Sequence, residues 1–90
     1  MRDEVPQHVL KSAKDGSLKV TARIGTAGLT PAVVNEIREQ LKRRRLVKVK
    51  LNRGLVSDSA GRSELWGELS AATTSRLVLT RGNVAVFWFG

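Results

Sequence analysis

The sequence predicts an α/β domain of the α+β kind, with elements in the order α-β-α-β-α-β-β and a four-stranded mixed sheet packed by helices. Two stretches, 18–24 and 46–51, alternate apolar and polar residues, which is typical of half-buried strands. Between them, 31–45 has apolar residues at helical spacing. Two apolar runs, 75–80 and 83–89, flank Arg81-Gly82, a tight hairpin signal. With 90 residues, we expect one domain spanning 1–90.

The first two elements are short. Residues 6–14 predict a helix, because Pro6 suits a first helical turn. The turn signal at 15–17 ends it. The strand predicted at 18–24 directs one set of apolar side chains to the same face: Leu18, Val20, Ala22 and Ile24.

The segment 29–45 carries a strong helix start. Thr30 can cap the free N–H groups of the first turn, and Pro31 falls at the first helical position. The helix ends on four cations, which suit the negative end of its dipole. Its predicted buried face consists of Val33, Val34, Ile37 and Leu41.

The second half of the chain supplies the rest of the core. Strand 46–51 is expected to bury its odd-numbered residues and to place Lys48 and Lys50 on the other face. Phe87 and Phe89 share one face of the last strand and Trp88 lies on the other. At least one of these faces is expected in the core, and Trp88, if exposed, could stack on a base. A helix is also predicted at 59–74, although Gly67 lowers its helix propensity. The residues of this helix that are expected to face the core are Leu65, Trp66, Leu69 and Ala72.

Charge is the most informative bulk property. Sixteen Lys and Arg against eight Asp and Glu give a net charge of +8 and a pI near 11.2. A domain this basic is expected to bind polyanions. Half of the cations lie between residues 38 and 53, where Glu39 alone opposes them: Arg38, Lys42, Arg43, Arg44, Arg45, Lys48, Lys50 and Arg53. Such clustering favours a binding surface over an ordinary solvated face.

Several function classes are not expected. The chain has no cysteine, and its one histidine, His8, has no partner at metal or triad spacing. No nucleophile motif or Walker loop is present, so we expect no catalytic residues, metal, cofactor or small-molecule substrate. The start of the chain lacks a signal-peptide core, and no apolar run approaches the 18–20 residues of a membrane span. These features predict a soluble, cytoplasmic protein.

The loop "GTAG" offers specific chemistry. Gly-x-x-Gly alone indicates only a tight turn. Here Gly25 and Gly28 leave a strand and enter a helix N-terminus, where free N–H groups favour an anion. Thr26 adds a hydroxyl, Ala27 is small, and Arg23 supplies a nearby cation. A comparable loop in KH domains clamps a nucleic-acid backbone. The helix that follows is about 22 Å long, so the loop and the cations at its far end would contact phosphates several nucleotides apart.

The stretch "IGTAGLTPAVVNEIREQLKRRRLVKVKL", 24–51, resembles the YhbY/CRM-domain family. The family pattern is a Gly-x-x-Gly loop, Leu-Thr, an amphipathic helix and a Leu/Ile-Val-Lys-Val-Lys strand. The resemblance implies an RNA-binding domain with a fold similar to the C-terminal domain of bacterial translation initiation factor three. Bacterial members associate with precursors of the large ribosomal subunit, and plant organellar members act in group II intron splicing. This chain departs from the pattern in its last strand, which lacks the usual Tyr-Arg, and in its shorter, less basic first helix.

We therefore predict a non-catalytic protein that contacts the phosphate backbone of structured RNA, expected to be ribosomal, in ribosome assembly or RNA processing. Ribosomal proteins or pre-ribosomal particles are possible further partners. The alternative is a ribosome-associated adaptor whose basic face meets an acidic protein; a DNA-binding protein is a third hypothesis that rests on charge alone. A helix covering the outer face of the sheet would change the role of Lys48 and Lys50. The predicted RNA-binding residues are Arg23, Gly25, Thr26, Ala27, Gly28, Arg38, Lys42, Arg43, Arg44, Arg45, Lys48, Lys50 and Arg53.

Overall fold

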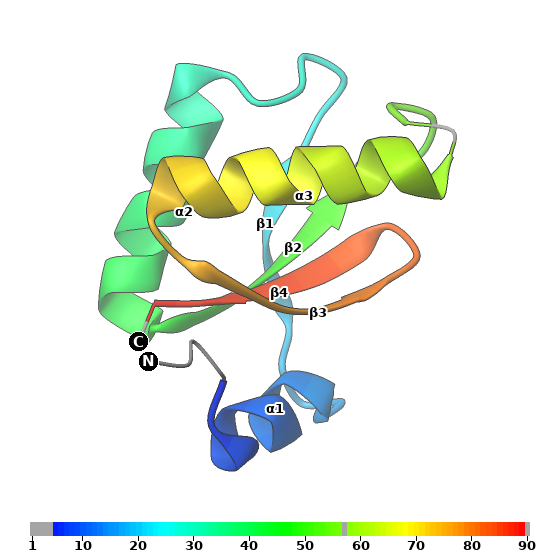
Figure 1. Cartoon of the computed structure of the whole chain (residues 1–90). Coiled ribbons are helices and arrows are strands. Elements are labelled where there is room, and N and C mark those ends of the chain that lie inside the picture. The colour runs from blue at the N-terminus through cyan, green and yellow to red at the C-terminus, as the bar shows by residue number, and fades with distance from the viewer. Residues whose placement is uncertain (1–4, 57, 90) are drawn as a thin grey trace.

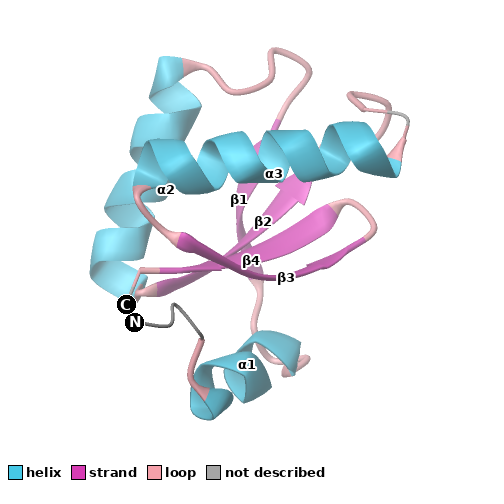
Figure 2. Ribbon diagram, viewed as in Figure 1, coloured by secondary structure: helices cyan, strands magenta, loops and turns pink. Residues whose placement is uncertain are grey.

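The computed structural model describes residues 5–56 and 58–89 and has the predicted order of elements (Figures 1 and 2). Strand β1 begins two residues later than predicted; the other boundaries agree within one residue. No helix in these ranges is long and apolar enough to cross a bilayer. The elements are α1 (Gln7–Lys14), β1 (Val20–Ile24), α2 (Pro31–Arg44), β2 (Leu46–Leu51), α3 (Ser59–Thr73), β3 (Arg76–Arg81) and β4 (Val84–Trp88).

The four strands form one mixed sheet in the order β1-β2-β4-β3, which confirms the predicted sheet. Strands β1 and β2 are parallel and are connected through α2, whereas β4 is antiparallel to both β2 and β3. The hairpin turn lies one residue later than predicted, because Arg81 pairs with Val84 and leaves Gly82-Asn83 as the loop. Gly82 has φ +59°, which suits the first loop position of a primed turn.

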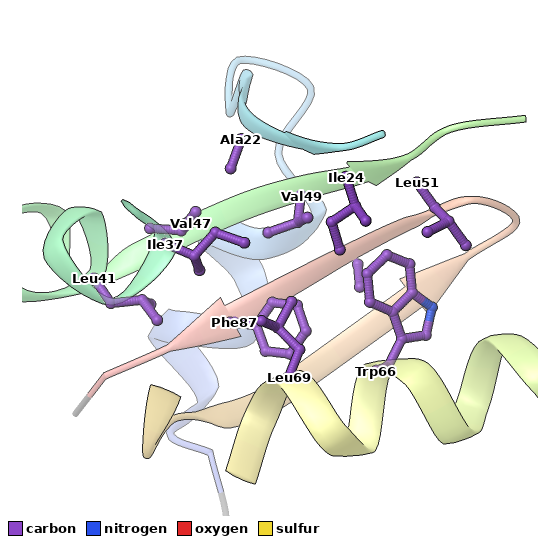
Figure 3. Packing of buried hydrophobic residues seen from close by; sticks show 11 residues of the cluster. Ala22, Ile24, Ile37, Leu41, Val47, Val49, Leu51, Trp66, Leu69 and Phe87 are labelled. Carbon is purple, nitrogen blue, oxygen red and sulfur yellow. The ribbon is translucent and has the colours of Figure 1, made fainter. Parts of the chain in front are cut away.

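The main core lies between the sheet and the helices α2 and α3 (Figure 3). Trp66 and Phe87 pack edge to face at its centre, with ring centroids 5.9 Å apart. The predicted inward residues of both helices contribute, although Ala72 is only half-buried and Thr73 takes the buried place. The buried cluster consists of Ala22, Ile24, Ile37, Leu41, Val47, Val49, Leu51, Trp66, Leu69, Ala85 and Phe87.

Helix α1 lies apart from α2 and α3, on the other side of the sheet (Figure 1). It buries Val9 and Ala13 there, and Val86 is the buried residue of the sheet's second face. A turn joins α1 to β1, in which the Ser17 N–H donates to Asp15 Oδ1 at 3.0 Å. This backbone hydrogen bond, helped by the Ser17 side chain, lowers the pKa of Asp15. Being short, α1 leaves part of this face uncovered.

A polar network closes the outer edge of β1. The sheet register shifts between Val20 and Ala22, so Thr21 is the extra residue of β1. The Thr21 hydroxyl donates to Gln40 Oε1 at 2.8 Å, and Gln40 Nε2 donates to the Thr21 carbonyl at 2.9 Å and to Glu36 Oε2 at 3.0 Å. Gln40, which the sequence did not place inside, thereby occupies an edge carbonyl that would otherwise be free to pair with another strand.

Replacing Thr74 with glycine is expected to raise the free energy of unfolding by about 1 kcal/mol. Thr74 ends α3 at φ 54° and ψ 44°, a left-handed conformation that disfavours a β-branched residue. The Ser75 N–H donates to the Ser70 carbonyl at 3.0 Å, as in the Schellman motif, where glycine is preferred. Urea denaturation of Thr74→Gly against wild type measures the effect. A loss of stability would show that the Thr74 side chain makes a compensating contact.

Candidate nucleic-acid interface

Three cations lie in one row across the sheet, on the same face of the sheet as α1. Arg23 of β1 is the register partner of Lys50 of β2. Lys50 pairs with Val84 of β4, and Val84 pairs with Arg81 of β3. One row across four strands thus reads Arg-Lys-Val-Arg. Because Ile24 and Leu51 are buried in the main core, these neighbouring side chains point to the opposite face.

A cavity of about 400 Å³ lies beside this row, at the end of the sheet where β1 and β2 both finish. Its lining includes three cations from three segments and no carboxylate: Arg23, Ile24, Gly25, Lys50, Leu51, Asn52, Arg53 and Asn83. Backbone bonds fix its rim, because the Asn52 N–H donates to the Ile24 carbonyl at 2.8 Å and the Leu51 N–H to the Asn83 carbonyl at 2.7 Å. Several cations around a hollow with a fixed backbone rim are suited to bind a phosphate group.

Without a bound anion, the adjacent cations lower the stability of the folded state. Like charges on directly neighbouring strand positions repel each other. Within the described ranges, the structure gives the side chains of Arg23, Lys50 and Arg53 no ion-pair or hydrogen-bond partner. An anionic ligand would remove this repulsion.

The Gly-x-x-Gly loop borders the same cavity through Gly25. The Gly28 N–H donates to the Gly25 carbonyl at 3.0 Å, which leaves Thr26 and Ala27 exposed at the tip. The predicted cap is present, because Thr30 Oγ1 accepts from the Val33 N–H at 3.2 Å. Thr30 therefore already accepts one of the N–H groups in the first turn of α2. An anion at this loop would be bound by groups of the loop and by the neighbouring cations.

The two loop glycines have different requirements, and this yields a prediction. Gly28 has φ +76°, whereas Gly25 has no positive φ and has open space where a side chain would begin. Gly28→Ala is expected to lower the free energy of unfolding by about 1–2 kcal/mol, and Gly25→Ala by less than about 0.5 kcal/mol. Chemical denaturation of both variants checks this. Equal losses would show that Gly25 also has a structural role.

Lys48 has a different environment from Lys50. Its Nζ donates to the Leu18 carbonyl at 3.3 Å, and its side chain is half-buried. It also lines a cavity of about 200 Å³ with Lys14 of α1 and Arg81. Lys48 thus lies half-buried beside the end of α1 and the segment that follows it, whereas Lys50 is exposed, so a covering element affects one of the two lysines.

The cations at the end of α2 lie at the opposite end of the sheet from the Gly-x-x-Gly loop. Lys42, Arg43 and Arg44 are exposed, and Lys42 pairs loosely with Glu39 at 3.7 Å. The Arg45 guanidinium lies 5.9 Å from the centre of the Phe89 ring. The 14 residues of α2 span about 21 Å, so this cluster and the loop are two separate features, as the length of the helix predicts.

Arg38 has a structural contact. Its guanidinium donates to the Ala72 carbonyl near the end of α3 and so ties α2 to α3. Three residues that the sequence did not single out border the cationic cavity or extend its row: Asn52, Arg81 and Asn83. Arg81 could have been assigned to the cationic row only from the register of β3 and β4. No group of potential metal ligands occurs among the residues that the structure describes.

The structure is a small α+β domain with a cationic sheet face and a glycine loop at one end. These features are typical of domains that bind polyanions. The sequence model of the CRS1/YhbY (CRM) domain matches residues 9–88, and the chain belongs to this family. The resemblance noted from 24–51 is thereby confirmed. A search among curated proteins finds no match.

A solved structure supports the same relationship. It is the solution structure of the hypothetical protein SAV1595 from Staphylococcus aureus, described as a candidate RNA-binding protein. The identity is 28% and the TM-score 0.74, over 92% of this chain and 82% of that protein.

Proposed function

We propose that this protein binds structured RNA through its phosphate backbone, without catalysing a reaction. The observation that carries the proposal is the row of Arg23, Lys50 and Arg81, beside a cavity that Arg53 and the Gly-x-x-Gly loop complete. Membership of the CRM domain family and the description given to SAV1595 support RNA as the polyanion. Contacts with phosphates rather than base edges favour recognition of RNA shape.

Within this proposal, the RNA is ribosomal and the protein acts in the cytoplasm during ribosome assembly or RNA processing. The support for this finer statement is the resemblance to bacterial members that associate with precursors of the large subunit. The cations at the end of α2 would then contact phosphates on a second part of the RNA, about the length of α2 away from the loop.

Fluorescence anisotropy tests RNA binding directly. A labelled RNA hairpin and a DNA hairpin of the same sequence are titrated at several salt concentrations. We expect sub-micromolar binding of the RNA at moderate salt, weaker binding of the DNA because it lacks the 2′-hydroxyl, and a steep salt dependence. Equal affinity for both hairpins would overturn specificity for RNA, and absence of binding would overturn the proposed function.

Crosslinking in cells, followed by sequencing of the attached RNA, tests the target. We expect enrichment of large-subunit ribosomal RNA with the wild type and its loss with an Arg23→Gln/Lys50→Gln variant. Partners recovered from a nuclease-treated lysate separate this function from a protein adaptor, because an RNA binder should lose them. Scattered RNA with no dependence on Arg23 and Lys50 would contradict the ribosomal assignment.

A further inference from the structure

The indole of Trp66 is a buried hydrogen-bond donor without a partner. Trp66 is 1% exposed, and within the described ranges its Nε1 has no hydrogen-bond acceptor. The indole N–H can only donate, and buried polar groups are nearly always paired. Leaving such a group unpaired is unfavourable for the folded state. An acceptor from outside the chain would remove this penalty.

Trp66 lines a cavity of about 140 Å³ whose other side chains offer hydroxyl groups and a guanidinium. In Figure 3 the indole nitrogen lies on the side of the ring away from Phe87 and Leu69. The structure gives Arg62 no ion pair and no side-chain hydrogen bond in the described part of the chain. The lining consists of Ser59, Arg62, Ser63, Trp66, Thr80 and Gly82.

The cavity lies at the N-terminus of α3, which begins at Ser59. The first turn of a helix carries N–H groups without intrahelical partners and the positive end of the dipole, both of which favour an anion. Asp58 precedes this turn, and its Oδ1 accepts from the Gly61 N–H at 2.7 Å, so it serves as the helix cap. The unpartnered Trp66 donor is a second observation, independent of the helix end, and it also calls for an acceptor.

The cavity also adjoins the cationic site. The turn of the β3–β4 hairpin lies between the two, because Asn83 lines the larger cavity and Gly82 the smaller one. A nucleic-acid backbone held by Arg23 and Lys50 would reach Arg62 by crossing this turn. The row of Arg23, Lys50 and Arg81 lies on the α1 face of the sheet, whereas the smaller cavity lies on the α3 face, because Thr80 pairs with Ala85 of the main core. A strand of RNA that contacts both would pass round the end of the hairpin.

We propose that the cavity at the start of α3 binds a second phosphate group of the RNA, held by Arg62, the hydroxyls of Ser59 and Ser63, and the Trp66 N–H. The inference rests on the proposed function, because the occupant is the RNA that the cationic site binds. It extends the interface to a helix that the sequence pattern assigned only to the core. A phosphate supplies the acceptor that the indole lacks.

NMR spectroscopy of the full chain tests this. A ¹⁵N-labelled sample is titrated with an RNA hairpin, and the indole resonance of Trp66 is assigned with a Trp88→Phe variant. We expect the Trp66 indole N–H to shift together with the loop amides of Thr26 and Ala27. In Arg62→Gln the indole shift should be lost while the loop shifts remain. Affinity at 0.1 M salt should fall about 5–8-fold, the contribution of one phosphate contact.

The outcomes separate the two proposals. Lys11→Gln is the matched control, because it removes one exposed cation of α1 away from both cavities. If the loop amides shift but the indole does not, and Arg62→Gln binds like Lys11→Gln, the cavity holds water only; this inference is then overturned and the proposed function stands. If neither the loop nor the indole responds to RNA, the proposed function fails as well.

Discussion

The double substitution Arg23→Gln/Lys50→Gln is expected to weaken binding of a structured RNA about 30-fold at 0.1 M salt. Each phosphate contact contributes about 0.7–0.9 to the slope of log affinity against log salt, so two lost contacts reduce affinity by about one and a half decades at this concentration. The slope itself should become shallower by about 1.5. Anisotropy titrations at four or five salt concentrations measure both quantities.

The same variant should be at least as stable as wild type, because it removes two like charges on adjacent strands. Affinity and stability are thus expected to move in opposite directions, which distinguishes a binding role from a folding role. Lys11→Gln/Lys19→Gln removes the same charge from exposed positions outside the cationic cavity and serves as the control. If the control loses as much affinity, the protein binds RNA by net charge alone and the row is not a site.

The order of elements could be predicted because each one has a local signature. Strand β2 alternates apolar and charged residues from Leu46 to Leu51, and α2 has a capping threonine followed by Pro31. These patterns depend only on neighbouring residues, so they are present in the sequence whatever the tertiary structure. The buried positions of Ile37 and Trp66 followed from the same periodicity.

The composition of the site was harder to predict because it depends on register. Arg81 joins the row of Arg23 and Lys50 only through the pairing of β4 with β2 and β3, which no local pattern specifies. Lys48 and Lys50 lie on the same face of β2, yet only Lys48 is half-buried, with its Nζ on the carbonyl of Leu18 in the segment that follows α1. The separation of the loop from the cations that begin at Lys42, in contrast, follows from the length of α2 alone, so it could be predicted.

The burial of Gln40 at the edge of β1 was missed for a related reason. Gln40 falls on the buried side of α2, but a glutamine at such a position is ordinarily assigned to the surface. It is buried because the bulge in β1 exposes the Thr21 carbonyl and hydroxyl, which Gln40 bonds. A bulge depends on the pairing of two strands, so the sequence of one strand does not reveal it.

Phe87→Ala is expected to have the largest effect on stability, lowering the free energy of unfolding by about 3–5 kcal/mol. Phe87 is fully buried, packs edge to face against Trp66 and belongs to the central part of the core (Figure 3). For a domain of this size, such a loss corresponds to a fall in melting temperature of roughly 12 °C or more. Differential scanning calorimetry and urea denaturation measure it.

Trp88→Ala is the matched comparison, because the neighbouring residue is also a large aromatic and lies on the other face of β4. Trp88 is half-buried between Leu46 and Arg76, so its removal is expected to cost about 1–2 kcal/mol. Comparable losses for both variants would show that the layer beneath α1 contributes as much as the main core. A large difference would mean that the domain is held by one core, on α2 and α3, and that the α1 face is free to carry the cations of the site.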